Sequence, residues 1–307
     1  MVLPIHDINP LARRPYVTWA LIAVNVVVFV FFEPVVTSIG GIQTAKPRTV
    51  CEQQRFFDHW AAIPKELLSN RATQVVPSGQ VVPTATGQLA CVAQEPPSFT
   101  KIPFLSVLTS MFLHGSWLHL LGNMLFLGVF GNNIEDRMGR LRYLGFYLLC
   151  GYVATYSFAL FEGNSPTTLI GASGAIAGVL GSYIVIFPRA KVIGVLTFLF
   201  FLPFWLPAWI VLGSWFLLQY LYVSGVGVAD GGSVAYGAHV AGFLFGLLLT
   251  LPFVKRLRAA GPDHHPGPPS HPWIRHLRLP SGPSTAAGRH SAPRGDVFRS
   301  RPGPGQD

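Results

Sequence analysis

The stretch Gly171-Ala172-Ser173-Gly174-Ala175 opens an apolar run that continues to Pro188. The run is near the roughly 20 residues that a helix needs to cross a bilayer. A serine between two glycines at its start has two interpretations. Small residues let neighbouring helices approach closely, and Ser173 is then only a tolerated polar side chain. Alternatively Ser173 is a reactive group, and the other polar residues of the chain decide between the two.

The composition of the whole chain is typical of a membrane protein. Half of its 307 residues are hydrophobic, only 11% are charged, and the mean hydropathy is +0.43. A soluble domain carries about 25% charged residues. The net charge of +9 does not indicate a nucleic-acid partner, because the basic residues concentrate at the ends of apolar segments and in the C-terminal tail. We therefore predict an all-α protein that resides in a lipid bilayer.

Six apolar segments are near the length that a bilayer requires. The stretch 192–223 is too long for one span, and Pro203 and Pro207 interrupt it. We therefore interpret 192–203 as an interfacial or re-entrant piece. The six predicted transmembrane helices are residues 16–36, 116–134, 143–161, 171–188, 204–223 and 236–254.

Basic clusters at the ends of these segments predict the orientation. With six spans the clusters all lie on one face, which the positive-inside rule makes cytoplasmic. This orientation puts both termini in the cytoplasm, with residues 1–15 as a short N-terminal segment. Residues 255–307 form a basic, Pro- and Gly-rich tail that we expect to be disordered. The clusters are Arg13 and Arg14; Arg137, Arg140 and Arg142; Arg189 and Lys191; and Lys255, Arg256 and Arg258.

The same orientation makes residues 37–103 a long first extracytoplasmic loop. Apolar side chains recur at helical spacing between residues 56 and 67, which predicts an amphipathic helix on the membrane surface. Residues 74–99 fit either a loop or a weak hairpin. Cys51 and Cys91 share this oxidising side, so a disulfide between them is a hypothesis. Cys150, inside the third span, is interpreted as a small apolar residue.

The polar side chains inside the spans lie at similar depth. Ionisable residues are costly in a bilayer and are therefore functional candidates. Ser173, His119, Asn123 and His239 all fall in the outer thirds of their spans. His239 supplies the base that a serine nucleophile needs. His119 and Asn123 share one helix face and, with the N–H group of Ser173, predict an oxyanion site.

The histidines have two other interpretations, metal binding and polar contacts between helices. His114 and His119 lack the four-residue spacing of a helical zinc pair, and the chain has no His-Glu-x-x-His motif. We therefore predict no metal site and no organic cofactor. Polar contacts between helices would explain His119 and His239, but they leave the matching depth of Ser173 and Asn123 unexplained.

Three motifs, in this order, resemble the rhomboid intramembrane serine proteases over roughly residues 100–254. The resemblance implies a six-helix bundle, with a catalytic core at 104–254, that hydrolyses peptide bonds of transmembrane proteins near the outer membrane face. It implies that Ser173 is the nucleophile and His239 the general base. His119 and Asn123 would stabilise the oxyanion, and His114 and Gly171 would support the site. The motifs are His114-Gly115-Ser116-Trp117-Leu118-His119-Leu120-Leu121-Gly122-Asn123, Gly171-Ala172-Ser173-Gly174 and Ala238-His239-Val240-Ala241-Gly242.

The chain also departs from that family. Ala177 stands where some members carry a tyrosine that stacks on the catalytic histidine, so the orientation of His239 is left open. The first loop has no Trp-Arg pair. An inactive relative that binds membrane proteins and a channel that uses the polar cavity are the alternative functions. The intact serine and histidine argue against the first, and the apolar inner parts of the spans argue against the second.

Three further expectations concern packing, the outer connections and location. We expect the glycines of span four, at 174, 178 and 181, to pack against Gly242 and Gly246 of span six. The Gly-rich connection 225–232 fits either a mobile lid or an ordinary loop. We expect a multi-pass protein of the plasma (inner) membrane. The natural substrate does not follow from the sequence.

Overall fold

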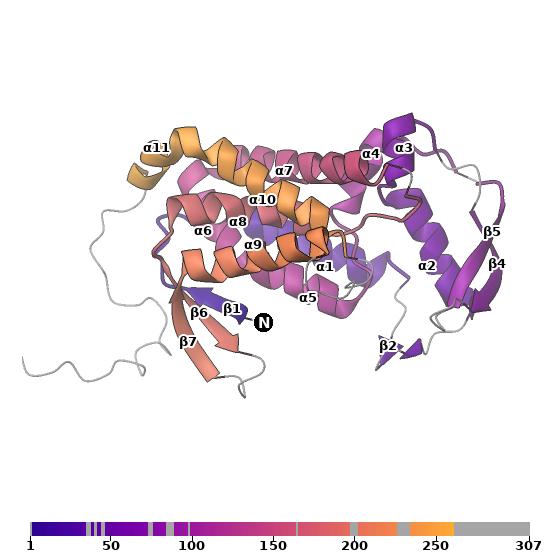
Figure 1. Ribbon diagram of the computed structural model, residues 1–307, viewed down its shortest axis with the longest axis horizontal. Helices are drawn as coiled ribbons and strands as arrows, with labels where there is room; N and C mark the ends of the chain where they lie inside the picture. Colours follow the sequence, from indigo (N-terminus) through magenta and orange to yellow (C-terminus); the bar gives the residue numbers. More distant parts are fainter. Residues whose placement is uncertain are drawn as a thin grey trace, which may run out of the picture. The chain divides into compact units, whose positions relative to one another are not determined.

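The fold is taken from a computed structural model, which describes residues 2–34, 38–39, 42–43, 47–72, 76–83, 89–97, 99–163, 165–196, 202–225 and 234–260. Within these ranges the chain is mostly helical, with short antiparallel strands (Figure 1). The connection 226–232 and the tail beyond residue 260 lie outside the described residues, so the predicted lid and the predicted disorder there stay predictions. The first tail residues are helical, which corrects the start of the disordered segment.

A helix lies at each predicted span. Two stretches, 140–161 and 236–259, are long and apolar enough to cross a membrane by length and composition, and three more helices are apolar but shorter. The six-span bundle therefore stays a prediction. The helices are α1 (Tyr16–Phe31), α5 (Trp117–Phe126) running through the π-helical turn η1 (Leu127–Gly131) into α6 (Asn132–Met138), α7 (Arg140–Phe161), α8 (Ser173–Ile186), α9 (Ala208–Ser224), and α10 (Tyr236–Thr250) continued by η2 (Leu251–Phe253) and α11 (Val254–Ala259).

Helices α8 and α10 pack backbone to backbone through glycines, and α10 also contacts α7 and α9 (Figure 1). A Cβ atom on Gly246 would lie 2.0 Å from the carbonyl oxygen of Gly178, and one on Gly181 would lie 2.1 Å from that of Phe243. Only glycine allows such an approach. The predicted packing of span four against span six is confirmed. Cys150 of α7 is fully buried, as a small apolar residue of the core would be.

A three-stranded antiparallel sheet includes residues of the predicted piece 192–203 and of the start of the predicted helix 204–223. It consists of β1 (Val2–Asp7), β6 (Lys191–Leu196) and β7 (Leu202–Pro207), in the order β1-β6-β7. The position of residues 192–203 as an interfacial or re-entrant piece stays a prediction. The chain is mostly helical rather than all-α, and the predicted helix start at 204 is wrong, because α9 begins at Ala208. Pro203 and Pro207 exclude a helix there, and β-branched residues such as Val192 and Ile193 favour strands.

The strand β1 is fixed to the helices through Asp7. Its carboxylate oxygen Oδ2 accepts hydrogen bonds from the Tyr183 hydroxyl at 2.6 Å and from the side-chain amides of Asn9 and Asn133 at 2.8 Å each. Burial raises the pKa of Asp7 to about 6, against the opposing effect of these hydrogen bonds. The buried carboxyl group therefore connects the N-terminal strand to α6 and α8.

A second acidic residue holds the start of α1. The Glu135 carboxylate accepts hydrogen bonds from the N–H groups of Val17 at 3.0 Å and Thr18 at 2.7 Å, and from the Thr18 hydroxyl at 2.8 Å. The first N–H groups of a helix have no acceptor within the helix, so Glu135 of α6 supplies one. This contact sets α1 against the α5–α6 segment.

The predicted first loop is largely folded. It contains β2 (Ser38–Ile39), β3 (Ile42–Gln43), α2 (Pro47–Trp60), α3 (Pro64–Ser69), and the hairpin of β4 (Val76–Pro83) and β5 (Leu89–Glu95), and α4 (Pro103–Ser110) follows. The amphipathic helix predicted over 56–67 is interrupted, because Pro64 starts a new helix. The hairpin alternative for 74–99 is confirmed. So is the disulfide hypothesis, since Cys51 is bonded to Cys91.

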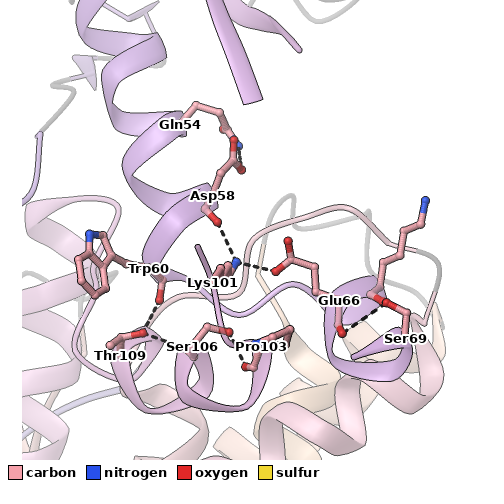
Figure 2. A network of polar contacts seen from close by, with 10 residues as sticks. Gln54, Asp58, Trp60, Glu66, Ser69, Lys101, Pro103, Ser106 and Thr109 are labelled. Carbon is pink, nitrogen blue, oxygen red and sulfur yellow. Dashed lines mark hydrogen bonds and ion pairs between the residues drawn. The ribbon is translucent and has the colours of Figure 1, made fainter. Parts of the chain in front are cut away.

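A buried ion pair joins the end of this loop to two of the loop's own helices. The Lys101 Nζ atom lies 2.6 Å from Glu66 Oε2 and donates to the carbonyl oxygen of Asp58 at 2.8 Å, two contacts that dashed lines mark in Figure 2. Only 2% and 4% of the two side chains of the pair are exposed. Burial lowers the pKa of Lys101 and raises that of Asp58. Nearby, the Thr109 hydroxyl of α4 donates to the carbonyl oxygen of Trp60, so the same region joins α2, α3 and α4.

Candidate active site

Two side chains predicted to react together are in direct contact. Ser173 is the first residue of α8 and His239 lies in the first turn of α10. The Ser173 Oγ and His239 Nε2 atoms are 2.7 Å apart. Glycine packing brings the two helix starts together, because a Cβ atom on Gly242 would lie 2.3 Å from the carbonyl oxygen of Gly174. A hydroxyl at hydrogen-bond distance from an imidazole nitrogen is placed to lose its proton to that nitrogen.

The turn before Ser173 depends on Gly171. Its φ of +116° is a backbone conformation that L side chains rarely adopt. Its N–H group donates to the carbonyl oxygen of Ser110 at 2.9 Å. A Cβ atom at this position would lie 2.8 Å from the ring of His119. Gly171 therefore turns the chain into α8 and leaves space for the imidazole of His119.

The other predicted site residues gather at this turn. The Asn123 Nδ2 atom lies 2.9 Å from His114 Nε2, and the rings of His114 and His119 have their centroids 5.0 Å apart. Asn123 and His114 are buried. The side-chain amide of Asn123 has two hydrogens, so one remains after the contact with His114. The structure thus brings His114, His119, Asn123 and Gly171 into one cluster next to Ser173.

A small cavity lies beside the Ser173 hydroxyl. Its volume is about 30 Å³, and Gly151 of α7, Gly171 and Ala238 are among its lining residues. A cavity of this volume admits water.

Gln219 is a site contact that the sequence analysis missed. Its Oε1 atom lies 2.9 Å from His239 Nδ1, and the side chain is buried within α9. Trp215, one turn earlier, has its ring centroid 6.0 Å from that of His239, and Tyr236 lies at 6.3 Å. The available signal was a buried amide in an otherwise apolar segment. Both ring nitrogens of His239 therefore have a partner.

Glu33 is the second contact that was missed. It follows α1, is buried, and accepts hydrogen bonds from the N–H group of His114 with both carboxylate oxygens at 3.0 Å. An acidic residue at the end of an apolar run was the signal. The contact fixes the backbone of the loop that carries His114. Among the described residues, no group of three or more His, Cys, Asp or Glu side chains is arranged to hold a metal ion.

Comparison with known proteins gives a consistent result. A family model described as Rhomboid domain matches residues 103–256. The chain is similar to Rhomboid protein 1, mitochondrial, of Saccharomyces cerevisiae, with 31% identity over 149 residues, 47% of this chain and 40% of the relative. It is 27% identical to Rhomboid protease GlpG of Yersinia pestis over 167 residues, 53% of this chain and 54% of the relative. Similarity to Presenilin-associated rhomboid-like protein A, mitochondrial, of Danio rerio is 35% over 95 residues, 30% of this chain and 24% of the relative. The chain thus matches from about a quarter to about half of the length of these relatives.

Proposed function

The chain belongs to the rhomboid family of membrane proteins, and from this premise we propose that it is an intramembrane serine endopeptidase. Its substrates are transmembrane proteins, which it cuts near the outer membrane face. The observation that carries the proposal is the 2.7 Å contact between Ser173 Oγ and His239 Nε2. One of the similar proteins, GlpG of Yersinia pestis, is named as a protease.

The proposed reaction begins with attack of Ser173 Oγ on the scissile carbonyl carbon while His239 Nε2 takes the hydroxyl proton. The carbonyl oxygen becomes an oxyanion. The N–H group of Ser173, which starts a helix and has no acceptor in it, donates to this oxygen together with the His119 ring and the free hydrogen of the Asn123 amide. His114 and Gly171 hold these donors in place.

The second half of the reaction restores the enzyme. The protonated His239 gives its proton to the leaving amine as the C–N bond breaks, which leaves the acyl group on Ser173. His239 then takes a proton from a water molecule that attacks this ester. The acid product leaves, and the proton returns to Ser173 Oγ. No metal ion or organic cofactor takes part in these steps.

The membrane in which this happens is a separate prediction. Two of the similar proteins are named as mitochondrial, whereas the resemblance to the family predicts a plasma-membrane protein. The loop charges of this chain predict that both termini lie in the cytoplasm. Protease digestion of terminal tags in intact and permeabilised cells tests this orientation. Tags that are cut in intact cells would contradict it.

The test of the function uses the full-length chain and a reporter protein with a single transmembrane helix. Ser173→Ala and His239→Ala should abolish cleavage, because each removes one partner of the dyad. Ser214→Ala, a serine of α9 that donates to the Val211 carbonyl oxygen, is the matched control and should cleave normally. Unchanged cleavage by Ser173→Ala would refute the proposal. A wild-type chain that binds the reporter without cutting it would instead favour the inactive, client-binding alternative.

A further inference from the structure

We infer that Gln219 is a positioning residue that holds the imidazole of His239 in the tautomer that the reaction needs. The inference deepens the proposed hydrolase function and rests on it. Its basis is a geometry in which the Gln219 Oε1 atom lies 2.9 Å from Nδ1 and the Ser173 Oγ atom lies 2.7 Å from Nε2 of the same ring.

The two contacts together determine where the ring proton resides. A neutral imidazole has one N–H donor and one acceptor nitrogen. An amide oxygen only accepts, so Nδ1 carries the hydrogen and donates it to Gln219. Nε2 is then unprotonated and accepts the Ser173 hydroxyl, which is the arrangement that a general base requires. Without Gln219 the ring could carry its proton on Nε2, where it would block the hydroxyl.

Gln219 is a buried polar residue of an apolar helix, and its hydrogen-bond partner lies on a different helix. The helix runs from Ala208 to Ser224 and is apolar apart from a few side chains, and Gln219 is among its buried residues. A buried amide group costs free energy unless it finds a hydrogen-bond partner. The partner here comes from α10, twenty residues further along the chain. The side chain of Ala177, one turn after Ser173, is a methyl group. It forms no hydrogen bond and therefore does not orient the His239 ring.

The chemistry of an amide also suits this environment. When His239 takes the Ser173 proton, the ring becomes a cation that still donates from Nδ1. The amide group of Gln219 stabilises this cation, because the oxygen end of the amide dipole is negative. A carboxylate would do this more strongly, but a charge buried in an apolar helix bundle is costly. Neutral amides that orient a catalytic histidine are known in cysteine proteases with a Cys-His-Asn arrangement. The structure therefore extends the dyad to Ser173, His239 and Gln219.

Other groups face the ring from the surrounding helices. Trp215 of α9 and Tyr236 of α10 contact it through their rings. Among the described residues, the Ser173 hydroxyl of α8 contacts Nε2, and the titratable groups that act on His239 are His119 of α5 and Tyr236 of α10. None of these accepts a hydrogen bond from Nδ1, so the role assigned to Gln219 is not duplicated within the described part of the chain.

The test compares three variants of the full-length protein in detergent. Gln219→Leu removes the acceptor and keeps a buried side chain of similar size. Gln219→Glu keeps an acceptor oxygen and adds a negative charge. Ser214→Ala changes a polar side chain of the same helix that does not touch His239. Three properties are measured: the rate at which a fluorophosphonate modifies Ser173 and the kcat and KM for the transmembrane reporter, both as a function of pH, and thermal unfolding.

We expect Gln219→Leu to lower kcat and the labelling rate by about 10- to 100-fold, with KM unchanged, because a misplaced ring proton affects the chemical step and not binding. Gln219→Glu should recover the rate at alkaline pH to within about threefold, and its activity should decline at a higher pH than that of the wild type as the medium is acidified, because a carboxylate favours the protonated ring. Ser214→Ala should match the wild type.

The possible outcomes separate this inference from the function on which it rests. A Gln219→Leu variant that is folded and labelled at the wild-type rate at every pH would overturn the inference and leave the hydrolase proposal intact. If Gln219→Leu does not fold, the pH profile of Gln219→Glu decides, and a profile identical to that of the wild type would overturn it. A wild-type chain that is not labelled at Ser173 would refute the hydrolase proposal, and the role of Gln219 with it.

Discussion

Replacing Gly246 with alanine should separate α8 from α10 and slow the reaction at Ser173. The added Cβ atom would lie 2.0 Å from the carbonyl oxygen of Gly178 and 2.6 Å from its Cα atom. Ordinary van der Waals contacts of a Cβ atom begin at 3.4 Å. Both clashing atoms belong to the backbone, so no side-chain rotation relieves the overlap. In a closely packed interior one helix must therefore move by about 1 Å.

The rate should suffer more than the stability. His239 precedes Gly246 by about two turns on the same helix, so the displacement reaches the 2.7 Å contact with Ser173. A misplacement of about 1 Å at a reacting group costs about 100-fold in rate. Overpacking costs about 1–3 kcal/mol of stability, but alanine also gains about 1 kcal/mol over glycine in a helix.

The assay measures fluorophosphonate labelling of Ser173 and thermal unfolding on the same preparation. Gly213→Ala of α9 is the matched control, because no neighbouring atom lies within 4 Å of its added Cβ. The control should be labelled at the wild-type rate. If folded Gly246→Ala is also labelled at the wild-type rate, the backbone contact of α8 and α10 does not set the distance between Ser173 and His239, and the reasoning is refuted.

Three other predictions concern the first loop and the N-terminal strand. Lys101→Met should lower the free energy of unfolding by about 3–5 kcal/mol, because it leaves the Glu66 carboxylate buried without its cation; a loss below about 1 kcal/mol in chemical denaturation would argue against the pair. Burial raises the pKa of Asp7 from 3.8 to about 6, so the folded chain binds a proton that the unfolded chain releases between these pH values. The free energy of unfolding should therefore fall by about 3 kcal/mol as the pH rises from about 4 to 6. Asp7→Asn should remove this slope in pH-dependent unfolding, and a slope equal to that of the wild type would contradict the assignment. Peptide mapping without reductant should recover Cys51 linked to Cys91, and two free thiols would rule out the disulfide.

The helices and the central contact of the site were predictable from local features. The length of an apolar run, limited by the thickness of a bilayer, placed α8 and α10. The glycines of α8 indicated a close partner helix. The matching depth of Ser173 and His239 then predicted that they meet. Each of these inferences uses a feature of a single apolar segment: its length, its glycines, or the position of a polar residue within it.

The sheet could not be predicted in this way. Strand β1 is six residues long, and its partner β6 begins at Lys191. No local sequence pattern shows that segments so far apart in the chain pair with each other. The amino-acid composition also does not show which strands are hydrogen-bonded to one another. The apolar character of β6 and β7 also resembles that of a membrane helix, and only Pro203 and Pro207 argued otherwise.

The contacts made by Gln219 and Glu33 were missed for a related reason. A helix that is apolar on all sides, such as α9, gives no indication of which face meets its neighbour. The sequence therefore shows that Gln219 is a polar residue within an apolar segment, but not that its side chain faces His239. Glu33 bonds to the backbone of His114, and a backbone partner has no sequence signature at all.

Mass-spectrometric mapping of the fluorophosphonate adduct on the full-length wild-type chain and on His239→Ala tests the central claim most directly. A nucleophile activated by the imidazole predicts one adduct, on the peptide that contains Ser173, and its loss in His239→Ala. An adduct on a different residue, or equal modification of Ser173 in the two proteins, would contradict the account.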